Sequence, residues 1–263
     1  MEVKNIKIVK LGGSVITIKD VRRSLRTEVI QRLIEELSLF YREYGDSYGL
    51  VVIHGGGSFG HPVVRDCISK YGKIDRNCYV DTADSMDTLN YILRRYCVVR
   101  GLPVVSLPPR SFCLLRSGRP YCFTKILSRI LSRELILLTY GDVVYSDRGF
   151  EVLSGDTLAW YIASKLGASE ILFVTDVDGL YDSDPKVNPS ARKIAQARID
   201  EVLGFLSQSS LDVDVTGGMR KKLYEGITLG VRGIRVKVLS GFIEGNLYSA
   251  LTSNNFTGST IWY

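Results

Sequence analysis

The chain has 263 residues, of which 45% are hydrophobic and 24% charged, and it carries a formal net charge of +6. These values are ordinary for a soluble globular protein and allow one large α/β unit or two closely packed lobes. No apolar run is long enough to span a bilayer, and residues 1–4 lack the layout of a signal peptide, so we expect a cytoplasmic protein without a membrane partner.

The positive charge raises the question of nucleic-acid binding. Basic pairs such as Arg22-Arg23 and Arg94-Arg95 are scattered along predicted helices, and no zinc-finger spacing or aromatic-basic RNA motif occurs. We therefore expect no nucleic-acid partner, and a surface that favours anionic small molecules.

Cysteine and histidine usage bears on redox state and metals. The five cysteines are odd in number and include no Cys-x-x-Cys pair. We therefore expect free thiols in a reducing compartment, and neither a disulfide framework nor a zinc site. With His54 and His61 as the only histidines, a histidine-based metal cage is not expected either.

The first predicted strand, residues 6–11, ends in the glycine turn Gly12-Gly13-Ser14. Apolar side chains then recur at helical spacing over residues 25–44, and a β-branched run at residues 51–53 predicts a second buried strand. Because a helix links them, the two strands are expected to pair in parallel through a right-handed crossover. The second strand ends in His54-Gly55-Gly56-Gly57, where the missing side chains allow a ligand to approach the backbone N–H groups.

Beyond the second glycine turn, Pro62 is predicted in the first turn of a helix, and residues 70–82 are polar and without a clear period. Helical spacing returns over residues 85–100, and a turn-rich segment predicts a β-hairpin over residues 112–123. Asp156 is placed to cap the helix that follows it. The remaining predicted elements are strands at 103–107, 135–139, 143–144, 170–174 and 234–239, helices at 158–166 and 199–206, a glycine turn at 213–222 that opens another helix, and a last edge strand at 258–261.

Strands alternate with helices along the chain, and glycine-rich polar segments recur at the carboxyl ends of strands. This pattern predicts an α/β fold with an open, mostly parallel sheet and a ligand site along one edge of it. No linker or repeat interrupts the chain, so we expect one domain of residues 1–263. A break near residues 140–150 suggests an N-terminal lobe of about residues 1–145 and a C-terminal lobe of about residues 146–263.

Several glycine turns together with Lys10, Lys19 and Lys222 would cradle phosphate groups. Phosphoryl transfer needs mainly positioning and positive charge around the transferred group, which lysines, backbone N–H groups and Mg²⁺ supply. The sequence contains neither a P-loop nor the catalytic loop of protein kinases. A Gly-x-Gly-x-x-Gly match at residues 55–60 is weak evidence for a dinucleotide site, because consecutive glycines satisfy that pattern too easily.

Five segments, taken in chain order, resemble the amino acid kinase superfamily. They are Lys10-Leu11-Gly12-Gly13-Ser14, Gly55-Gly56-Gly57, Ser154-Gly155-Asp156, Thr175-Asp176-Val177-Asp178-Gly179-Leu180-Tyr181 and Gly217-Gly218-Met219-x-x-Lys222. The resemblance implies the amino acid kinase fold, a three-layer αβα sandwich with an open, mostly parallel central sheet. It also implies that the N-terminal lobe binds the acceptor substrate and the C-terminal lobe the nucleotide.

Within the superfamily, three details are similar to the isopentenyl phosphate kinases. They are the segments at residues 10–19, 54–62 and 214–219. The resemblance implies ATP-dependent phosphorylation of isopentenyl phosphate to isopentenyl diphosphate in isoprenoid biosynthesis (the alternate mevalonate pathway), with Mg²⁺ held mainly by phosphates, and a homodimer. The alternatives are a kinase of another small acid or of a phosphonate such as fosfomycin, a non-catalytic nucleotide-binding sensor of the same fold, and a nucleic-acid binder, which salt-sensitive binding would reveal.

The resemblance also implies roles for single residues. The implied catalytic residues are Lys10, Lys19, His61, Asp156 and Lys222, with His61 bonding the acceptor phosphate and Asp156 holding the lysines. The implied acceptor site comprises Gly56, Gly57, Gly60, His61, Gly141, Asp142, Ser154 and Gly155. The implied nucleotide site comprises Lys10, Gly12, Gly13, Ser14, Thr175, Asp176, Asp178, Gly179, Gly217 and Lys222, with backbone N–H groups of Gly12, Gly13, Gly56 and Gly57 donated to phosphates.

Some of these residues also have a purely structural interpretation. His54 ends a buried strand, and we expect its role to be structural. Asp156 could be a helix cap, an organiser of the lysines or both, and Lys19 could be a solvated loop lysine. Only family spacing selects Lys222 over its neighbour Lys221. The helix at residues 85–100 is expected to wall the isoprenoid tail.

Overall fold

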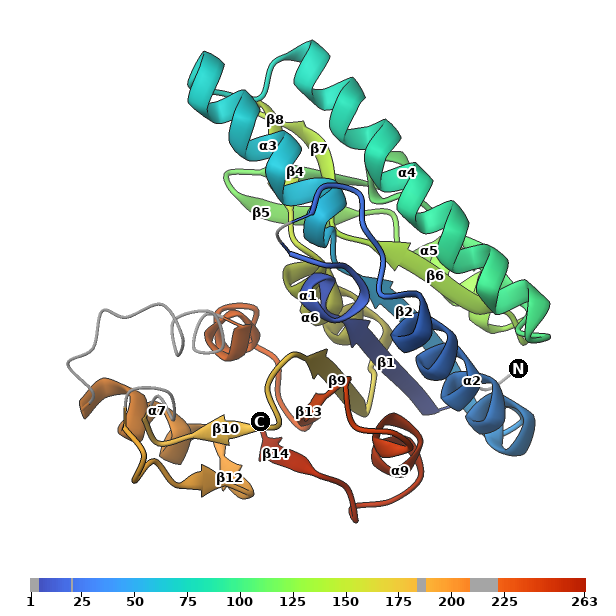
Figure 1. Cartoon of the computed structure of the whole chain (residues 1–263), viewed down its shortest axis with the longest axis vertical. Helices are drawn as coiled ribbons and strands as arrows, with labels where there is room; N and C mark the ends of the chain where they lie inside the picture. Colours follow the sequence, from blue (N-terminus) through green and yellow to red (C-terminus); the bar gives the residue numbers. More distant parts are fainter. Residues whose placement is uncertain (1–4, 20, 184–187, 209–221) are drawn as a thin grey trace.

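The computed structural model describes residues 5–19, 21–183, 188–208 and 222–263, and for residues 205–208 the backbone alone. The strands of its main sheet are β1 (Asn5–Leu11), β2 (Tyr48–His54), β3 (Val104–Ser106), β6 (Ile136–Tyr140), β9 (Glu170–Thr175), β12 (Gln196–Arg198), β13 (Arg235–Ser240) and β14 (Gly258–Trp262). They form an eight-stranded sheet in the order β12-β14-β13-β9-β1-β2-β6-β3. Neighbours are parallel except for β13 and β14. The helices cover both faces of this sheet (Figure 1), so the predicted three-layer αβα fold is confirmed.

The alternation of side chains along β1 shows why helices cover both faces of the sheet. Successive residues of a strand point to opposite faces, so Ile6 and Ile8 lie on one face and Val9 and Leu11 on the other. All four side chains are buried, each in the core of its own face. A strand that is apolar on both sides is typical of a parallel sheet between two layers of helices.

One helix layer packs on the face of Val9 and Leu11. It contains α1 (Gly13–Ile16), α2 (Thr27–Tyr44), α4 (Arg76–Val99) and α9 (Asn246–Thr252), with α3 (Gly57–Tyr71) beside α4. The opposite layer contains α5 (Lys125–Leu131), α6 (Gly155–Leu166), α7 (Ile199–Gln208) and the helical residues 222–228. Within the described part of the chain, no helix is both long and apolar enough to cross a membrane.

A smaller sheet lies beside the main one. Its strands are β4 (Cys113–Arg116), β5 (Arg119–Cys122), β7 (Asp142–Ser146) and β8 (Gly149–Leu153), in the order β5-β4-β7-β8. The predicted hairpin at residues 112–123 is confirmed as the antiparallel pair β4–β5. A 3-10 turn, η1 (Pro109–Ser111), leads into β4, and a further small pair joins β10 (Leu180–Tyr181) to β11 (Lys193–Ile194).

Two predictions about the α3–α4 region were wrong. Residues 70–82 are not irregular, because α3 runs to Tyr71 and α4 begins at Arg76, with Asp75 accepting a 2.8 Å hydrogen bond from the Cys78 N–H as its N-cap. Pro62 lies in the second turn of α3, since that helix begins at Gly57. A proline there leaves the Ser58 carbonyl without its helical donor, and the Arg23 N–H bonds it instead at 3.3 Å.

The prediction that the last strand, at residues 258–261, lies at the edge of the sheet was also wrong. β14 pairs with β13 on one side and with β12 on the other. β12 is a short strand without a hydrophobic run, so its sequence carries no signal that predicts a pairing partner. The edge position next to β14 is occupied by β12, which the sequence did not predict.

The expectation of free thiols was wrong for four of the five cysteines. Cys67 of α3 is bonded to Cys78 of α4, and Cys113 of β4 is bonded to Cys122 of β5. Cys97 alone is free, and it is buried. The first pair forms because α3 and α4 pack side by side, and the second because the hairpin register puts the two cysteines opposite each other. Cysteine usage therefore does not support a reducing compartment.

Candidate active site

The candidate site lies at the carboxyl ends of β1, β2 and β9. From β1 the sheet extends through β2 on one side and through β9 on the other. In open α/β sheets such a switch in strand order leaves a crevice at the carboxyl ends of the strands, where ligands bind. The two predicted glycine turns follow directly after β1 and β2 at this edge.

These two glycine turns are packed against each other. A Cβ atom on Gly13 would lie 2.3 Å from the backbone nitrogen of Gly57. Gly57 has φ +46, and a Cβ atom there would lie 2.1 Å from Oγ1 of Thr17. Only glycine meets both demands, so the glycines keep two backbone turns in contact at the end of the sheet.

The N–H groups of these turns are not all available. The Gly12 N–H donates to the Val174 carbonyl of β9 at 2.8 Å, so its predicted donation to a phosphate is contradicted. In the described residues, no hydrogen-bond acceptor faces the N–H groups of Gly13, Gly56 or Gly57. These three groups lie at the starts of α1 and α3, where helical N–H groups have no partner within the helix and favour anions.

A carboxylate and two lysines form the centre of the site. Lys10 Nζ lies 2.8 Å from Oδ1 of Asp156, and Lys222 Nζ lies 2.8 Å from Oδ2. Lys10 is on the α6 side of β1 because its position in the strand alternates with Val9 and Leu11. The three residues carry a net positive charge at the end of the sheet, in partly buried surroundings. Such a cluster attracts a phosphate group and neutralises its oxygens.

Local contacts place Asp156 and Lys222. Ser154, and not Asp156, caps α6 by accepting a 3.0 Å hydrogen bond from the Thr157 N–H, so the predicted capping role of Asp156 was wrong. Asp156 stands in the first turn of α6 instead, with its carboxylate directed to the lysines. One turn further on, the indole N–H of Trp160 donates to the Lys222 carbonyl at 2.6 Å and so fixes the helix that carries this lysine.

Burial alone would raise the pKa of Asp156. The charges of Lys10 and Lys222 and their hydrogen bonds outweigh this effect, and the pKa of Asp156 lies below its ordinary value. The carboxylate is therefore ionised throughout the neutral range and holds both ammonium groups in place.

His61 lies on α3, four residues after Gly57 and thus on the same face of the helix. The residue is exposed at the surface, yet nearby protein atoms shield part of its ring from water and lower its pKa. The positive charges of Lys10, Arg65 and Lys222 lower that pKa further, while Asp156 raises it. The ring is neutral at pH 7 and can donate one hydrogen bond into a positively charged site.

His54, the other histidine, is fully buried at the end of β2. Its Nδ1 lies 3.1 Å from the Gly55 carbonyl and its Nε2 lies 3.2 Å from Nδ2 of Asn90, so Nδ1 donates and Nε2 accepts. Desolvation lowers the pKa of His54 to about 4. The ring also stacks on Tyr140 at 5.0 Å. The predicted structural role fits these contacts.

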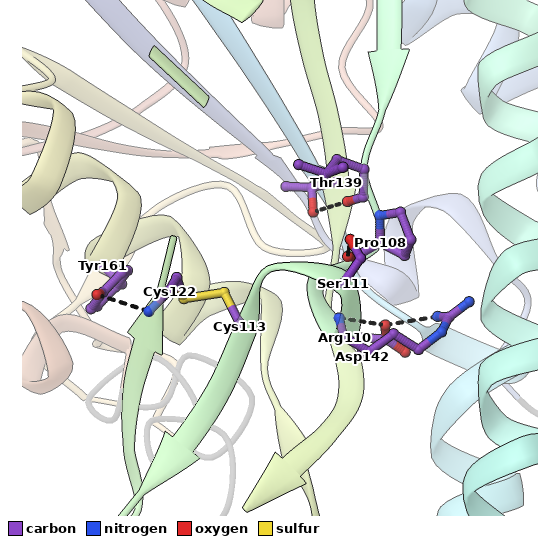
Figure 2. The surroundings of a disulfide bond; sticks show 9 residues. Pro108, Arg110, Ser111, Cys113, Cys122, Thr139, Asp142 and Tyr161 are labelled. Atoms are coloured by element: carbon purple, nitrogen blue, oxygen red, sulfur yellow. Dashed lines mark hydrogen bonds and ion pairs between the residues drawn. A yellow bond between two sulfur atoms is a disulfide. The ribbon is translucent and has the colours of Figure 1, made fainter. Parts of the chain in front are cut away.

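Sequence reasoning missed an ionic network beside the acceptor turn. Arg110 of η1 donates to Oδ2 of Asp142 at 2.8 Å and to Asp87 of α4 (Figure 2 shows the Asp142 contact). The Tyr140 hydroxyl donates to Oδ1 of Asp87 at 2.6 Å. Asp142, a predicted acceptor-site residue, is buried with its side chain fully covered. Nothing in the local pattern around Arg110 signals these contacts, because its partners lie on other elements.

The predicted nucleotide residues around β9 are only partly available. The Thr175 hydroxyl is used within its own turn, at 2.9 Å from the Val177 carbonyl. Asp178 pairs with Lys193 at 3.0 Å and with the Tyr181 hydroxyl at 3.0 Å, whereas Asp176 is exposed. Gly179 has φ +150 and packs beside Ser259, which makes it a turn residue.

Other predicted residues fall around these elements. Ser14 lies in α1, and Gly60 lies in α3 with its N–H donated to Gly56. Gly141 donates its N–H to the His54 carbonyl at 3.0 Å and lies close to Gly155. Lys19 is exposed in a turn, and among the described residues no ion pair joins it to Asp156. Gly217 and Lys221 lie outside the described residues.

The carboxylates of the candidate site are paired with cations instead of being grouped around a metal site. Among the described residues, no three His, Cys, Asp or Glu side chains gather closely enough to hold one. Asp156 is already engaged by two lysines, and Asp142 by Arg110. The side chains present would therefore leave a Mg²⁺ ion to ligands from nucleotide phosphates and water, which is its usual preference in sites of this kind.

The chain is similar to known proteins over most of its length. A sequence model of the amino acid kinase family matches residues 5–240. An isopentenyl phosphate kinase of Methanocaldococcus jannaschii is 32% identical over 261 residues, which cover 94% of this chain and 95% of the relative. One of Methanothermobacter thermautotrophicus is 30% identical, with 97% and 98% covered. An X-ray structure of isopentenyl phosphate kinase matches with a TM-score of 0.82 at 27% identity, covering 98% of this chain and 100% of that chain.

Proposed function

Because the chain belongs to the amino acid kinase family, and relatives that match it over nearly their full length are isopentenyl phosphate kinases, we propose that it phosphorylates isopentenyl phosphate with ATP. The product is isopentenyl diphosphate, a precursor of isoprenoids. The observation that carries the proposal is the pairing of Lys10 and Lys222 with Asp156 beside two glycine turns. A phosphotransferase whose acceptor is itself a phosphate needs positive charge more than it needs a base.

The chemistry of the acceptor, a phosphate monoester, explains why the site contains lysines and needs no strong general base. A phosphate monoester is largely ionised near neutral pH, so its oxygen can attack without losing a proton to the protein. The bond from the γ-phosphorus to the ADP oxygen breaks as the bond to the acceptor oxygen forms. Lys10 and Lys222 neutralise the transferred group, and the neutral His61 donates a hydrogen bond to the acceptor phosphate. Asp156 keeps the lysines aimed at the transferred group.

The two substrates divide between the lobes. The acceptor binds over residues 1–145, against the turn at Gly56-Gly57 and the α3 helix with His61. ATP binds over residues 146–263, beside β9 and the helical residues 222–228 that carry Lys222. Lys19 is exposed to solvent in the structure. Its side chain contacts a phosphate oxygen once the substrates are bound.

Two further features rest on family resemblance. Mg²⁺ would be held by the nucleotide phosphates and would supply positive charge at their oxygens, and the protein acts as a homodimer. The cytoplasmic location predicted from the sequence is kept as part of the proposal, but the two disulfides do not support it.

The proposal is tested by measuring ADP release from Mg-ATP with isopentenyl phosphate, in parallel with fosfomycin and acetylglutamate. Turnover restricted to isopentenyl phosphate and close analogues is expected. Turnover with another acceptor alone would keep the phosphoryl-transfer site and overturn the substrate. ATP binding without transfer to any acceptor would favour a nucleotide sensor instead. The Lys10→Met variant is expected to lose turnover, and Lys125→Met, at the exposed start of α5, serves as the matched control.

A further inference from the structure

Arg110 joins two carboxylates from different parts of the fold. Its guanidinium pairs with Asp87 of α4 through Nη2 and with Asp142 of β7 through Nη1, the latter at 2.8 Å. Its backbone N–H also faces Oδ2 of Asp142 at 3.4 Å (Figure 2). The bridge is therefore made by one residue of a short 3-10 turn that has no place in the proposed chemistry.

Each partner of Arg110 adjoins a part of the candidate site. Asp142 follows Gly141, whose N–H donates to the His54 carbonyl at 3.0 Å. A Cβ atom on Gly141 would lie 2.7 Å from the backbone nitrogen of Gly155, so the turn before Asp142 is pressed against the start of α6. The next residue of α6 is Asp156, which holds both lysines.

Asp87, the other partner of Arg110, is connected to the glycine turn after β2. Asp87 accepts a hydrogen bond from Tyr140, and the Tyr140 ring stacks on His54 at 5.0 Å. His54 is held in turn by Asn90, and it directly precedes Gly55. The network around Arg110 thus connects to both the glycine turn after β2 and the start of α6, and within the described residues its members form no ion pair with Lys10 or Lys222.

We propose that Arg110 is a positioning residue of the phosphoryl-transfer site, acting through Asp142 and Gly141 on Asp156 and through Asp87 and Tyr140 on the glycine turn. This role rests on the proposed function. Displacing reacting groups by about 1 Å can lower turnover by about 100-fold, so a bridge of this kind affects kcat without touching substrate. It is expected to leave the affinity for ATP nearly unchanged, because none of the predicted nucleotide residues around β9 belongs to the network of Arg110.

A purely structural role must be separated from positioning, because Arg110→Met leaves the buried Asp142 without its cation. The double variant Arg110→Met/Asp142→Asn removes that unpaired charge, and the amide oxygen of the new side chain can still accept the Val143 N–H. The experiment measures the melting temperature, kcat and both KM values for each variant. Arg148→Met, which breaks the pair between the exposed Arg148 of the β7–β8 turn and Glu151 of β8, is the matched control.

The expected result is that the double variant recovers the melting temperature while kcat stays on the order of 10- to 100-fold low, with KM for ATP within about twofold. Arg110→Lys, which can reach only one carboxylate at a time, is expected to give an intermediate kcat. Recovery of kcat together with the melting temperature would overturn the proposal, as would a loss shared equally by Arg148→Met.

A readout independent of turnover separates this proposal from the proposed function. The chain has only two histidines, so the His61 ring can be followed by NMR titration without substrate. If Arg110 positions Asp156 and Lys10, the double variant shifts the His61 titration midpoint, and Arg148→Met does not. An unchanged midpoint in the double variant would overturn the proposal. Absence of wild-type turnover with isopentenyl phosphate would overturn the proposed function alone.

Discussion

Lys10 and Lys222 do not contact separate acids but share one carboxylate, each pairing with a different oxygen of Asp156 at 2.8 Å. One lysine comes from the first strand of the sheet and the other from a helix near the end of the chain. The shared carboxylate fixes the spacing of the two ammonium groups, and its own charge is outweighed by theirs. A phosphate that approaches meets two cations in a fixed arrangement.

The Asp156→Asn variant is expected to lower kcat by on the order of 100-fold or more, because both lysines lose their common anchor. The pKa of Asp156 is held below its ordinary value, so its ion pairs stabilise the fold at neutral pH. That contribution is lost as the pH falls through the lowered pKa. Unfolding free energies measured between pH 7 and pH 2 should therefore fall less steeply in Asp156→Asn than in wild type. If the unfolding free energies of wild type and Asp156→Asn fell equally steeply with pH, the stabilising role of the Asp156 ion pairs would be contradicted.

The His61→Ala variant is expected to lower kcat on the order of 100-fold while the melting temperature changes little, since the residue is exposed at the surface. His61→Gln keeps a donor and should restore part of the activity. Wild-type turnover in His61→Ala would remove this residue from the mechanism.

The pKa of His61 gives a separate test. It is lowered first by the protein atoms that shield part of the ring from water and then by the charge of Lys10, so the ring becomes protonated only below its ordinary range. Lys10→Met is expected to raise the NMR titration midpoint of His61, whereas Lys125→Met should leave it in place. His54 does not interfere, because its pKa lies at about 4.

The Cys67–Cys78 disulfide ties the outer end of α3 to the start of α4. Replacing both cysteines by serine is expected to lower the free energy of unfolding by about 2–4 kcal/mol, measured by denaturant titration without reductant. The Cys113→Ser/Cys122→Ser variant controls for the second disulfide. If a reductant destabilised the wild type no more than it destabilised the Cys67→Ser/Cys78→Ser variant, the bond would not contribute.

Gly57 and Gly72 form a matched pair for testing the glycine contact. Both have positive φ, but a Cβ atom on Gly72 would meet nothing within 4 Å, while one on Gly57 would meet Thr17 at 2.1 Å. Gly72→Ala is expected to cost about 1–2 kcal/mol of stability from backbone strain alone. Gly57→Ala should cost more and should also reduce turnover, and Thr17→Ala in the same chain should recover part of the loss. Equal costs at the two positions would contradict the packed-turn interpretation.

Much of the site could be predicted from sequence because its signals are local. Gly12-Gly13 and Gly55-Gly56-Gly57 each follow a predicted strand, and parallel strands bring such carboxyl ends to one edge. Ser154-Gly155-Asp156 likewise precedes a helical pattern. The cap was assigned to Asp156 instead of Ser154 because both residue types cap helices, and only the path of the chain chooses between them.

The sequence by itself thus determined most of the strands and helices, the glycine turns and the residue types proposed for the phosphate site, since each depends on neighbours along the chain. The helical residues within 70–82 and the short strand β12 were not predicted. The tertiary structure alone decided which cysteines pair, which residue caps α6 and that Arg110 bridges Asp87 and Asp142. These outcomes depend on distances between elements that are far apart in the chain. Such distances are set by the packing of helices and the register of strands, which no local pattern encodes.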